Sequence, residues 1–150
     1  MIDIDTIDFG EISPDEFARL VKDLSKRELV AITAGPSRAR IVDEILGRMA
    51  AEFNPETAGR LKALIRWRIV DDDQPDISFE MDIANGTCRI SPDTSEGEPR
   101  VSLTMSAADF ARLVSGNASG TALFMTRRLK VTGDLGLAAT LVRYFNIPKA

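Results

Sequence analysis

The chain has 150 residues, of which 44% are hydrophobic and 28% charged, the composition of one globular domain large enough to bury a core. Its formal net charge of -4 argues against nucleic acid as a partner. The sequence lacks histidine, the commonest general base and metal ligand, and its single cysteine excludes an internal disulfide, so we expect no metal site and no cofactor.

The beginning of the sequence shows no targeting signal. No apolar run is long enough to span a bilayer, and residues 1–5 lack the basic region of a signal peptide, so we expect a cytoplasmic protein. Residues 1–12 largely alternate isoleucine with aspartate. This pattern fits an extended arm or edge strand as well as an acidic, partly disordered tail.

Capping residues predict helices in the first third of the chain. Ser13, Pro14 and Glu16 combine a serine N-cap, a proline at the first helical position and a capping-box glutamate. The capping box recurs from Ser25, which predicts a second short helix ending at Gly35. A third helix with a wide apolar stripe is then expected over residues 37–53. Asn54 and Pro55 predict one further capped helical turn before the first strand.

A change of hydrophobic period to two predicts a sheet from about Ala63, with strands near residues 63–70 and 77–83. Asn85 and Gly86 predict a two-residue hairpin that pairs Ile83 with Cys88. Cys88 is then a structural thiol on the apolar face, because no histidine can activate it. We interpret residues 71–75 as a solvated turn and residues 91–99 as a polar loop.

The last third continues with a strand over residues 101–105, a helix opened by Ser106 and a further helix from about Ser119 to Thr126. A short strand follows, in which Leu129 and Val131 share one face. Asp134 then caps a closing helix with one continuous apolar stripe. The sequence therefore predicts an α+β fold: a five-stranded, mainly antiparallel sheet with helices packed on one face.

The sequence contains no recognisable catalytic constellation. No nucleophile has a base beside it, and the glycine-containing segment 116–120 lacks the lysine of a phosphate-binding loop. The three adjacent aspartates 71–73 cannot all face one ion. We therefore expect a protein that is not an enzyme and has no catalytic residues.

The run from Leu123 to Asp134, followed by Leu-Gly-Leu-Ala, is similar to the closing segment of the sterol carrier protein type 2 family. Members show there an Ala-Phe pair, a glycine, a Leu-Lys-Val strand, a Gly-Asp or Gly-Asn turn and a Leu-Ala helix. A second matching block runs from residue 49 to 56 and leads to residues 65–69. The resemblance covers about residues 40–148 and suggests a stand-alone bacterial member. Arg127 stands where the family usually has the glycine, so the local backbone is expected to differ.

The resemblance implies an apolar tunnel that binds fatty acid, fatty acyl-CoA, sterol or phospholipid without chemical turnover. The residues expected to line it are apolar ones of the second half of the chain: Phe79, Met81, Met105, Phe110, Leu113, Leu123, Phe124, Met125, Leu137, Leu141 and Phe145. Periodicity alone fits a filled core equally well. The alternative is therefore a protein-interaction or regulatory module, with a filled core, that is accessory to a partner enzyme.

Two units are expected, an N-terminal arm and helical extension over residues 1–36 and a lipid-binding domain over residues 37–150. The extension carries an apolar face formed by Phe17, Leu20, Val21 and Leu24. This face must either pack back on the domain or bury itself against a second copy, and we favour a homodimer through these helices. Transient membrane contact is a further expected interaction.

Overall fold

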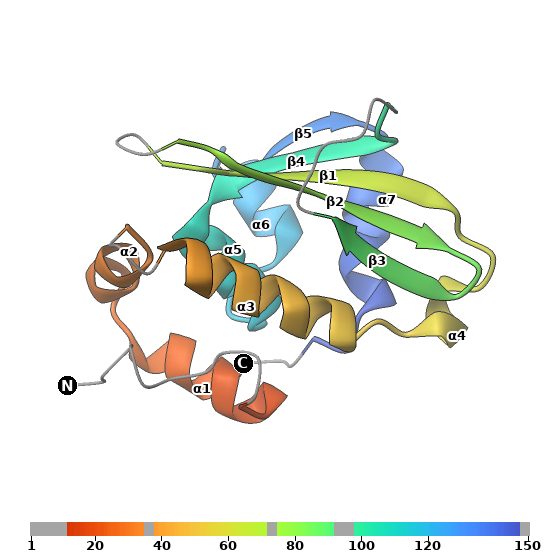
Figure 1. Cartoon of the computed structure of the whole chain (residues 1–150). Helices are drawn as coiled ribbons and strands as arrows, with labels where there is room; N and C mark the ends of the chain where they lie inside the picture. Colours follow the sequence, from red (N-terminus) through yellow and green to blue (C-terminus); the bar gives the residue numbers. More distant parts are fainter. Residues whose placement is uncertain (1–11, 35–37, 72–74, 92–97, 148–150) are drawn as a thin grey trace.

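The computed structural model describes residues 12–34, 38–71, 75–91 and 98–147 (Figure 1). The predicted N-terminal arm, the predicted third-helix start at residue 37, residues 72–74 of the predicted turn and most of the predicted polar loop lie outside the described residues. The helices are α1 (Pro14–Asp23), α2 (Lys26–Ala34), α3 (Arg38–Ala51), α4 (Pro55–Ala58), α5 (Ala107–Val114), α6 (Gly120–Met125), α7 (Leu135–Thr140) and the 3-10 helix η2 (Leu141–Tyr144). The strands are β1 (Ala63–Val70), β2 (Ile77–Ala84), β3 (Thr87–Ser91), β4 (Val101–Ser106) and β5 (Lys130–Gly133).

The five strands form one sheet in the order β3-β2-β1-β4-β5. β1 and β4 run parallel, whereas the other three pairs are antiparallel. The predicted hairpin is confirmed: Asn85 and Gly86 both have positive φ, at 53° and 73°, and Ile83 pairs with Cys88. The predicted α+β class and the mainly antiparallel sheet are therefore both confirmed.

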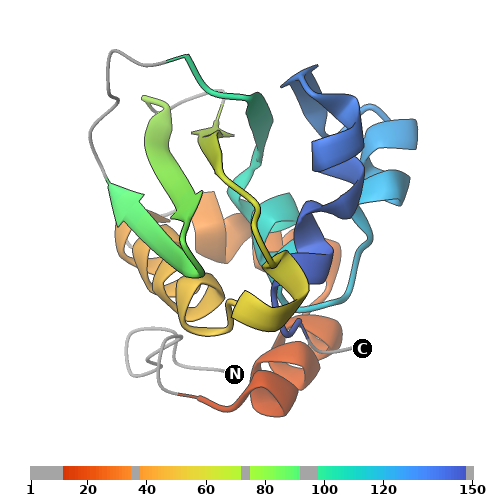
Figure 2. The ribbon, with the colours of Figure 1, turned by 90° about the vertical axis from the view of Figure 1, so that its right-hand side faces the viewer.

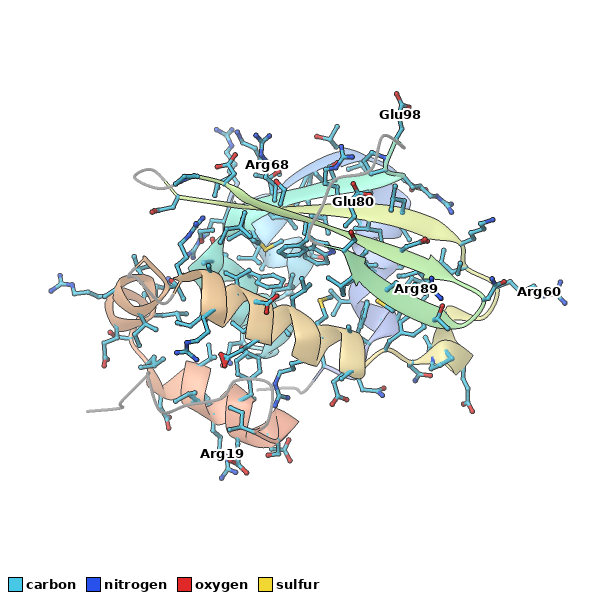
Figure 3. The ribbon with its side chains drawn as sticks, in the orientation of Figure 1. Arg19, Arg60, Arg68, Glu80, Arg89 and Glu98 are labelled. Carbon is cyan, nitrogen blue, oxygen red and sulfur yellow. The ribbon has the colours of Figure 1, made fainter. Side chains whose placement is uncertain are left out.

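The helices cover one face of this sheet. α3 and α5 lie against it, and α1 lies on the far side of α3 (Figure 1). Alternation along β1 and β2 buries Trp67 and Phe79 toward these helices, where both rings contact Phe110 at centroid distances of 5.5 and 6.1 Å. Arg68 and Glu80 therefore belong to the opposite face of the sheet (Figure 3).

Hydrogen bonds from capping side chains are present at the predicted helix starts. Ser13 Oγ accepts from the Glu16 amide at 3.1 Å. Ser25 and Glu28 form the reciprocal capping box, with both side chain to backbone distances at 3.1 Å. Asn54 Oδ1 accepts from two amides at the start of α4. These local signals predicted helix positions correctly because each cap satisfies amides that have no partner within the helix.

The N-terminal helices belong to the main hydrophobic core. Phe17 and Val21 are 0% and 4% exposed within a single chain, in the same cluster as Trp67, and Leu20 and Leu24 pack against that cluster. Asn117 Nδ2 also donates to the carbonyl oxygen of α1 residue Ala18 at 3.0 Å. The apolar face that suggested a homodimer is therefore covered by its own chain, which removes the reason for that prediction.

The closing helix is shorter than its apolar stripe suggests. α7 ends at Thr140 and tightens into η2, although Leu137, Leu141 and Phe145 are all buried as the stripe requires. Tertiary hydrogen bonds follow at the end of η2: the Asn54 backbone amide donates to the Tyr144 carbonyl oxygen at 2.7 Å, and the Asn146 backbone amide donates to the Glu52 carbonyl oxygen at 2.7 Å. The chain end is thereby tied to the segment after α3.

Candidate functional site

A cavity of about 390 Å³ is lined by residues in and beside α6, β5, α7 and η2. Figure 2 shows α6 and α7 side by side at one end of the sheet. The volume of the cavity is within the range of small-molecule sites. Its lining is mainly apolar, with two hydroxyl groups and one guanidinium: Ser119, Gly120, Thr121, Phe124, Leu129, Val131, Leu135, Ala138, Ala139, Val142 and Arg143.

The start of α7 is held in place by the turn after β5. Gly133 has φ 106°, and a Cβ there would lie 2.5 Å from the Arg100 carbonyl oxygen, so the turn requires glycine. The Asp134 carboxylate accepts from the Leu137 amide at 2.9 Å and from Arg100 Nε at 3.0 Å. These hydrogen bonds, the backbone one first, hold the pKa of Asp134 below its usual value. The predicted cap is therefore present and fixes one wall of the cavity.

The turn after α6 fixes the opposite wall. Arg127 has φ 63°, the Arg127 amide donates to the Phe124 carbonyl oxygen, and the Arg128 amide donates to the Leu123 carbonyl oxygen. These two bonds and the left-handed residue form a Schellman motif, in which glycine is the usual residue. Arg127 thus adopts the left-handed conformation that a non-glycine residue resists.

An ion pair ties this turn to the core. Arg128 Nη2 lies 2.7 Å from Asp109 Oδ1, and Arg128 Nε donates to Asp109 Oδ2 at 3.2 Å. Asp109 is 4% exposed and sits in the first turn of α5, where the Ser106 hydroxyl caps its amide. The contact therefore joins the α6–β5 turn, beside the cavity, to the helix that packs under the sheet.

A second, more open groove of about 620 Å³ adjoins the cavity. It shares Phe124, Leu129 and Val131 with the cavity. Its other lining residues are more polar: Met125, Arg127, Lys130 and Thr132. The two hollows therefore form one site that is apolar inside and basic at its open side.

The polar side chains of the lining carry hydroxyl, guanidinium and ammonium groups. Neither hollow is lined by a carboxylate, a cysteine or a histidine. Within the described ranges, no cluster of three potential metal ligands exists. Cys88 lies on β3, at the other edge of the sheet, where burial, with the Asp82 charge second, raises the pKa of its thiol to about 11. The arrangement can bind an apolar molecule and pair with an anion.

The structure brings few of the eleven predicted site residues to this site. Phe124 lines both hollows, and Met125 lines the open groove. The remaining nine are at most 5% exposed, belong to the main hydrophobic core and do not line either hollow: Phe79, Met81, Met105, Phe110, Leu113, Leu123, Leu137, Leu141 and Phe145.

The sequence analysis did not predict the cavity wall formed by α7 and η2. Leu135, Ala138, Ala139 and Val142 recur at helical spacing, beside the stripe of larger residues that enters the core. This second stripe was the available signal. It is weak because alanines at exposed helix positions are ordinary, and here their small size leaves the space.

The five-stranded mixed sheet with its helices has the fold of a sterol-carrier-like domain. The chain belongs to the SCP-2 sterol transfer family, whose model matches residues 42–146. Members of this family bind and transfer lipids. The predicted resemblance over residues 40–148 is thus confirmed.

Particular relatives differ in size and role. Peroxisomal multifunctional enzyme A of Dictyostelium discoideum is 30% identical over 64 residues, which span 43% of this chain and 14% of that protein. Palmitated SCP2L2 from Aedes aegypti has a similar structure, with a TM-score of 0.53 at 14% identity over 71% of this chain and 95% of that one. The inverting sec-alkylsulfatase Pisa1 from Pseudomonas sp. gives a TM-score of 0.63 at 12% identity, over 75% of this chain and 17% of that one. The two structural likenesses show the fold alone.

Proposed function

We propose that the protein binds and carries a single-chain anionic lipid, such as a fatty acid, in the cavity between α6, β5 and α7, without chemical turnover. The observation that carries this proposal is an apolar cavity of about 390 Å³ whose lining includes one cation, Arg143, and no carboxylate. The acyl chain lies against Leu129, Val131 and Val142. The head group pairs with the Arg143 guanidinium, a fork of donors suited to a carboxylate.

Burial of a long acyl chain supplies useful affinity without further polar contacts. Burying an acyl chain gains about 0.8 kcal/mol per methylene, and binding costs roughly 4 kcal/mol or more in lost freedom. About fifteen buried methylenes leave a net ~8 kcal/mol, which corresponds to micromolar binding. The palmitated state of the Aedes aegypti relative supports an acyl chain as the ligand.

A filled core supports the alternative function. Beneath the sheet, the Phe110 ring packs edge to face on Trp67 and at a tilt on Phe79, and all three residues are at most 3% exposed. A tight core of this kind suits an accessory module that binds a partner enzyme. The two functions differ in whether the lateral cavity takes a lipid.

The proposal is tested by a substitution on α7 that places a large side chain in the cavity. Ala139 on α7 lines the cavity, so Ala139→Trp should reduce binding of a fluorescent fatty acid at least tenfold, since the indole occupies the acyl site. Ala122→Trp is the matched control, an exposed alanine on α6 that does not line the cavity, and it should bind as the wild type does. In the same titration, Arg143→Met should weaken binding of the fatty acid but not binding of its methyl ester, which carries no charge. No binding by the wild type, or equal binding by both tryptophan variants, would favour the accessory-module function.

A further inference from the structure

The surface around α6 and the start of α7 exposes large apolar side chains. Of the four such side chains that stand out as exposed among the described residues, three lie here: Phe124 at 46%, Met125 at 74% and Leu135 at 58%. Phe124 and Met125 border the open groove, and Phe124 and Leu135 border the cavity. Adjacent exposed side chains of this size mark an interaction surface.

Cations surround these apolar side chains. Arg127 and Lys130 line the open groove and Arg143 lines the cavity, whereas neither hollow is lined by an acidic residue. In the part of the chain that the structure describes, none of these three cations forms an ion pair. Their positive charge is therefore available to a partner.

The charge distribution along the sequence strengthens this observation. Residues 110–150 contain six of the 19 Lys and Arg residues but one of the 23 Asp and Glu residues, Asp134. That aspartate is paired with Arg100 at 3.0 Å. An acidic protein thus concentrates positive charge in the segment that builds the cavity, which gives this face a sign opposite to that of the whole chain.

We propose that this face, formed by Phe124, Met125, Arg127, Lys130, Leu135 and Arg143, docks on the surface of an anionic lipid bilayer. The three apolar side chains enter the headgroup layer, and the three cations pair with acidic lipid head groups. The choice of a lipid surface over an acidic protein rests on the proposed lipid-binding function, because Phe124 belongs to both the docking face and the cavity. Docking therefore places the cavity next to the lipids of the bilayer.

Co-sedimentation with vesicles tests the docking face. The full chain should bind vesicles of phosphatidylcholine mixed with phosphatidylserine, should bind pure phosphatidylcholine weakly, and should lose binding as salt rises. Arg127→Glu with Lys130→Glu should weaken binding to the mixed vesicles roughly 20-fold or more, since each removed cation costs about fivefold. Met125→Asp should also weaken it, because a carboxylate replaces the most exposed apolar side chain.

Matched controls separate the face from net charge and general hydrophobicity. Arg60→Glu with Lys62→Glu changes the net charge equally at two exposed cations outside both hollows, and Arg60 extends into solvent beside the β2–β3 hairpin (Figure 3). Val30→Asp matches Met125→Asp, because Val30 is 52% exposed and lies on α2. These controls should bind the mixed vesicles as the wild type does.

Each remaining outcome has a defined meaning. Equal binding to neutral and mixed vesicles, equal loss in the control pair, or binding to polyglutamate without binding to vesicles overturns the bilayer proposal. The fluorescent fatty acid is titrated into the same variants without vesicles. If the protein binds the fatty acid but not the vesicles, the docking proposal alone is overturned. If it binds the vesicles but not the fatty acid, the proposed function alone is overturned.

Discussion

At the scale of single residues, Arg127 holds a conformation that disfavours an L-residue. Its φ of 63° completes the Schellman motif that ends α6. A left-handed conformation costs a non-glycine residue about 1 kcal/mol or more. Arg127→Gly should therefore raise the free energy of unfolding by about 1 kcal/mol, measured by urea denaturation.

The control for this change is a glycine in an ordinary helical position. Ala122→Gly on α6 should lower the free energy of unfolding by up to about 1 kcal/mol, because a helical glycine loses more backbone entropy. If both glycine variants are destabilised alike, then Arg127 does not occupy a left-handed conformation in solution.

At the scale of elements, α7 depends on its cap, because six residues are too few for a helix that is stable alone. Asp134 accepts from the Leu137 amide and from Arg100, and both interactions lower the pKa of its carboxyl. A lowered folded-state pKa means that this carboxylate stabilises the fold fully above its unfolded pKa near 3.8 and loses that contribution as the pH falls through the lowered value.

We therefore expect Asp134→Asn to be less stable than the wild type at neutral pH, with a difference that shrinks as the pH falls below about 4. Urea denaturation of both proteins between about pH 3 and pH 7 measures it. The Arg100→Gln variant should show the same trend with a smaller difference, because the backbone hydrogen bond to Asp134 remains. A difference that stays constant down to pH 3 would contradict the role of the charge.

At the scale of the whole molecule, the N-terminal helices complete the core. Phe17 is 0% exposed and lies under Arg48, whose guanidinium carbon is 5.1 Å from the ring centroid. Burial lowers the pKa of Arg48, with Glu52 opposing the shift. Phe17→Ala should reduce the free energy of unfolding by about 3–5 kcal/mol, since it empties a fully buried position. The control Val30→Ala, at a half-exposed position, should change it by less than about 0.5 kcal/mol.

The same variant tests whether these helices form a separate extension. If Phe17→Ala leaves the main unfolding transition unchanged by circular dichroism and by Trp67 fluorescence, then residues before Arg38 unfold independently. We expect one unfolding transition by both probes, with its midpoint at a lower urea concentration than in the wild type. The reason is that Phe17 and Trp67 belong to one cluster of buried side chains.

Much of the fold could be predicted from the sequence because its signals are local. Ser13, Ser25, Asn54, Ser106 and Asp134 each cap a helix by a hydrogen bond to an amide within three residues. The period of two located the strands, and the two-residue turn set the hairpin register by geometry alone. The family, too, was recognisable from short motifs in the right order.

The tertiary structure alone decided what those elements enclose. Periodicity gives the face of a helix but not its partner, so the apolar face with Phe17 could equally have met a second copy. The stripe of large residues filled the core, while the smaller residues Ala138 and Ala139 left the cavity beside Phe124. A hollow depends on the volumes of side chains from elements far apart in sequence, which is why the sequence predicted apolar residues but could not place the space between them.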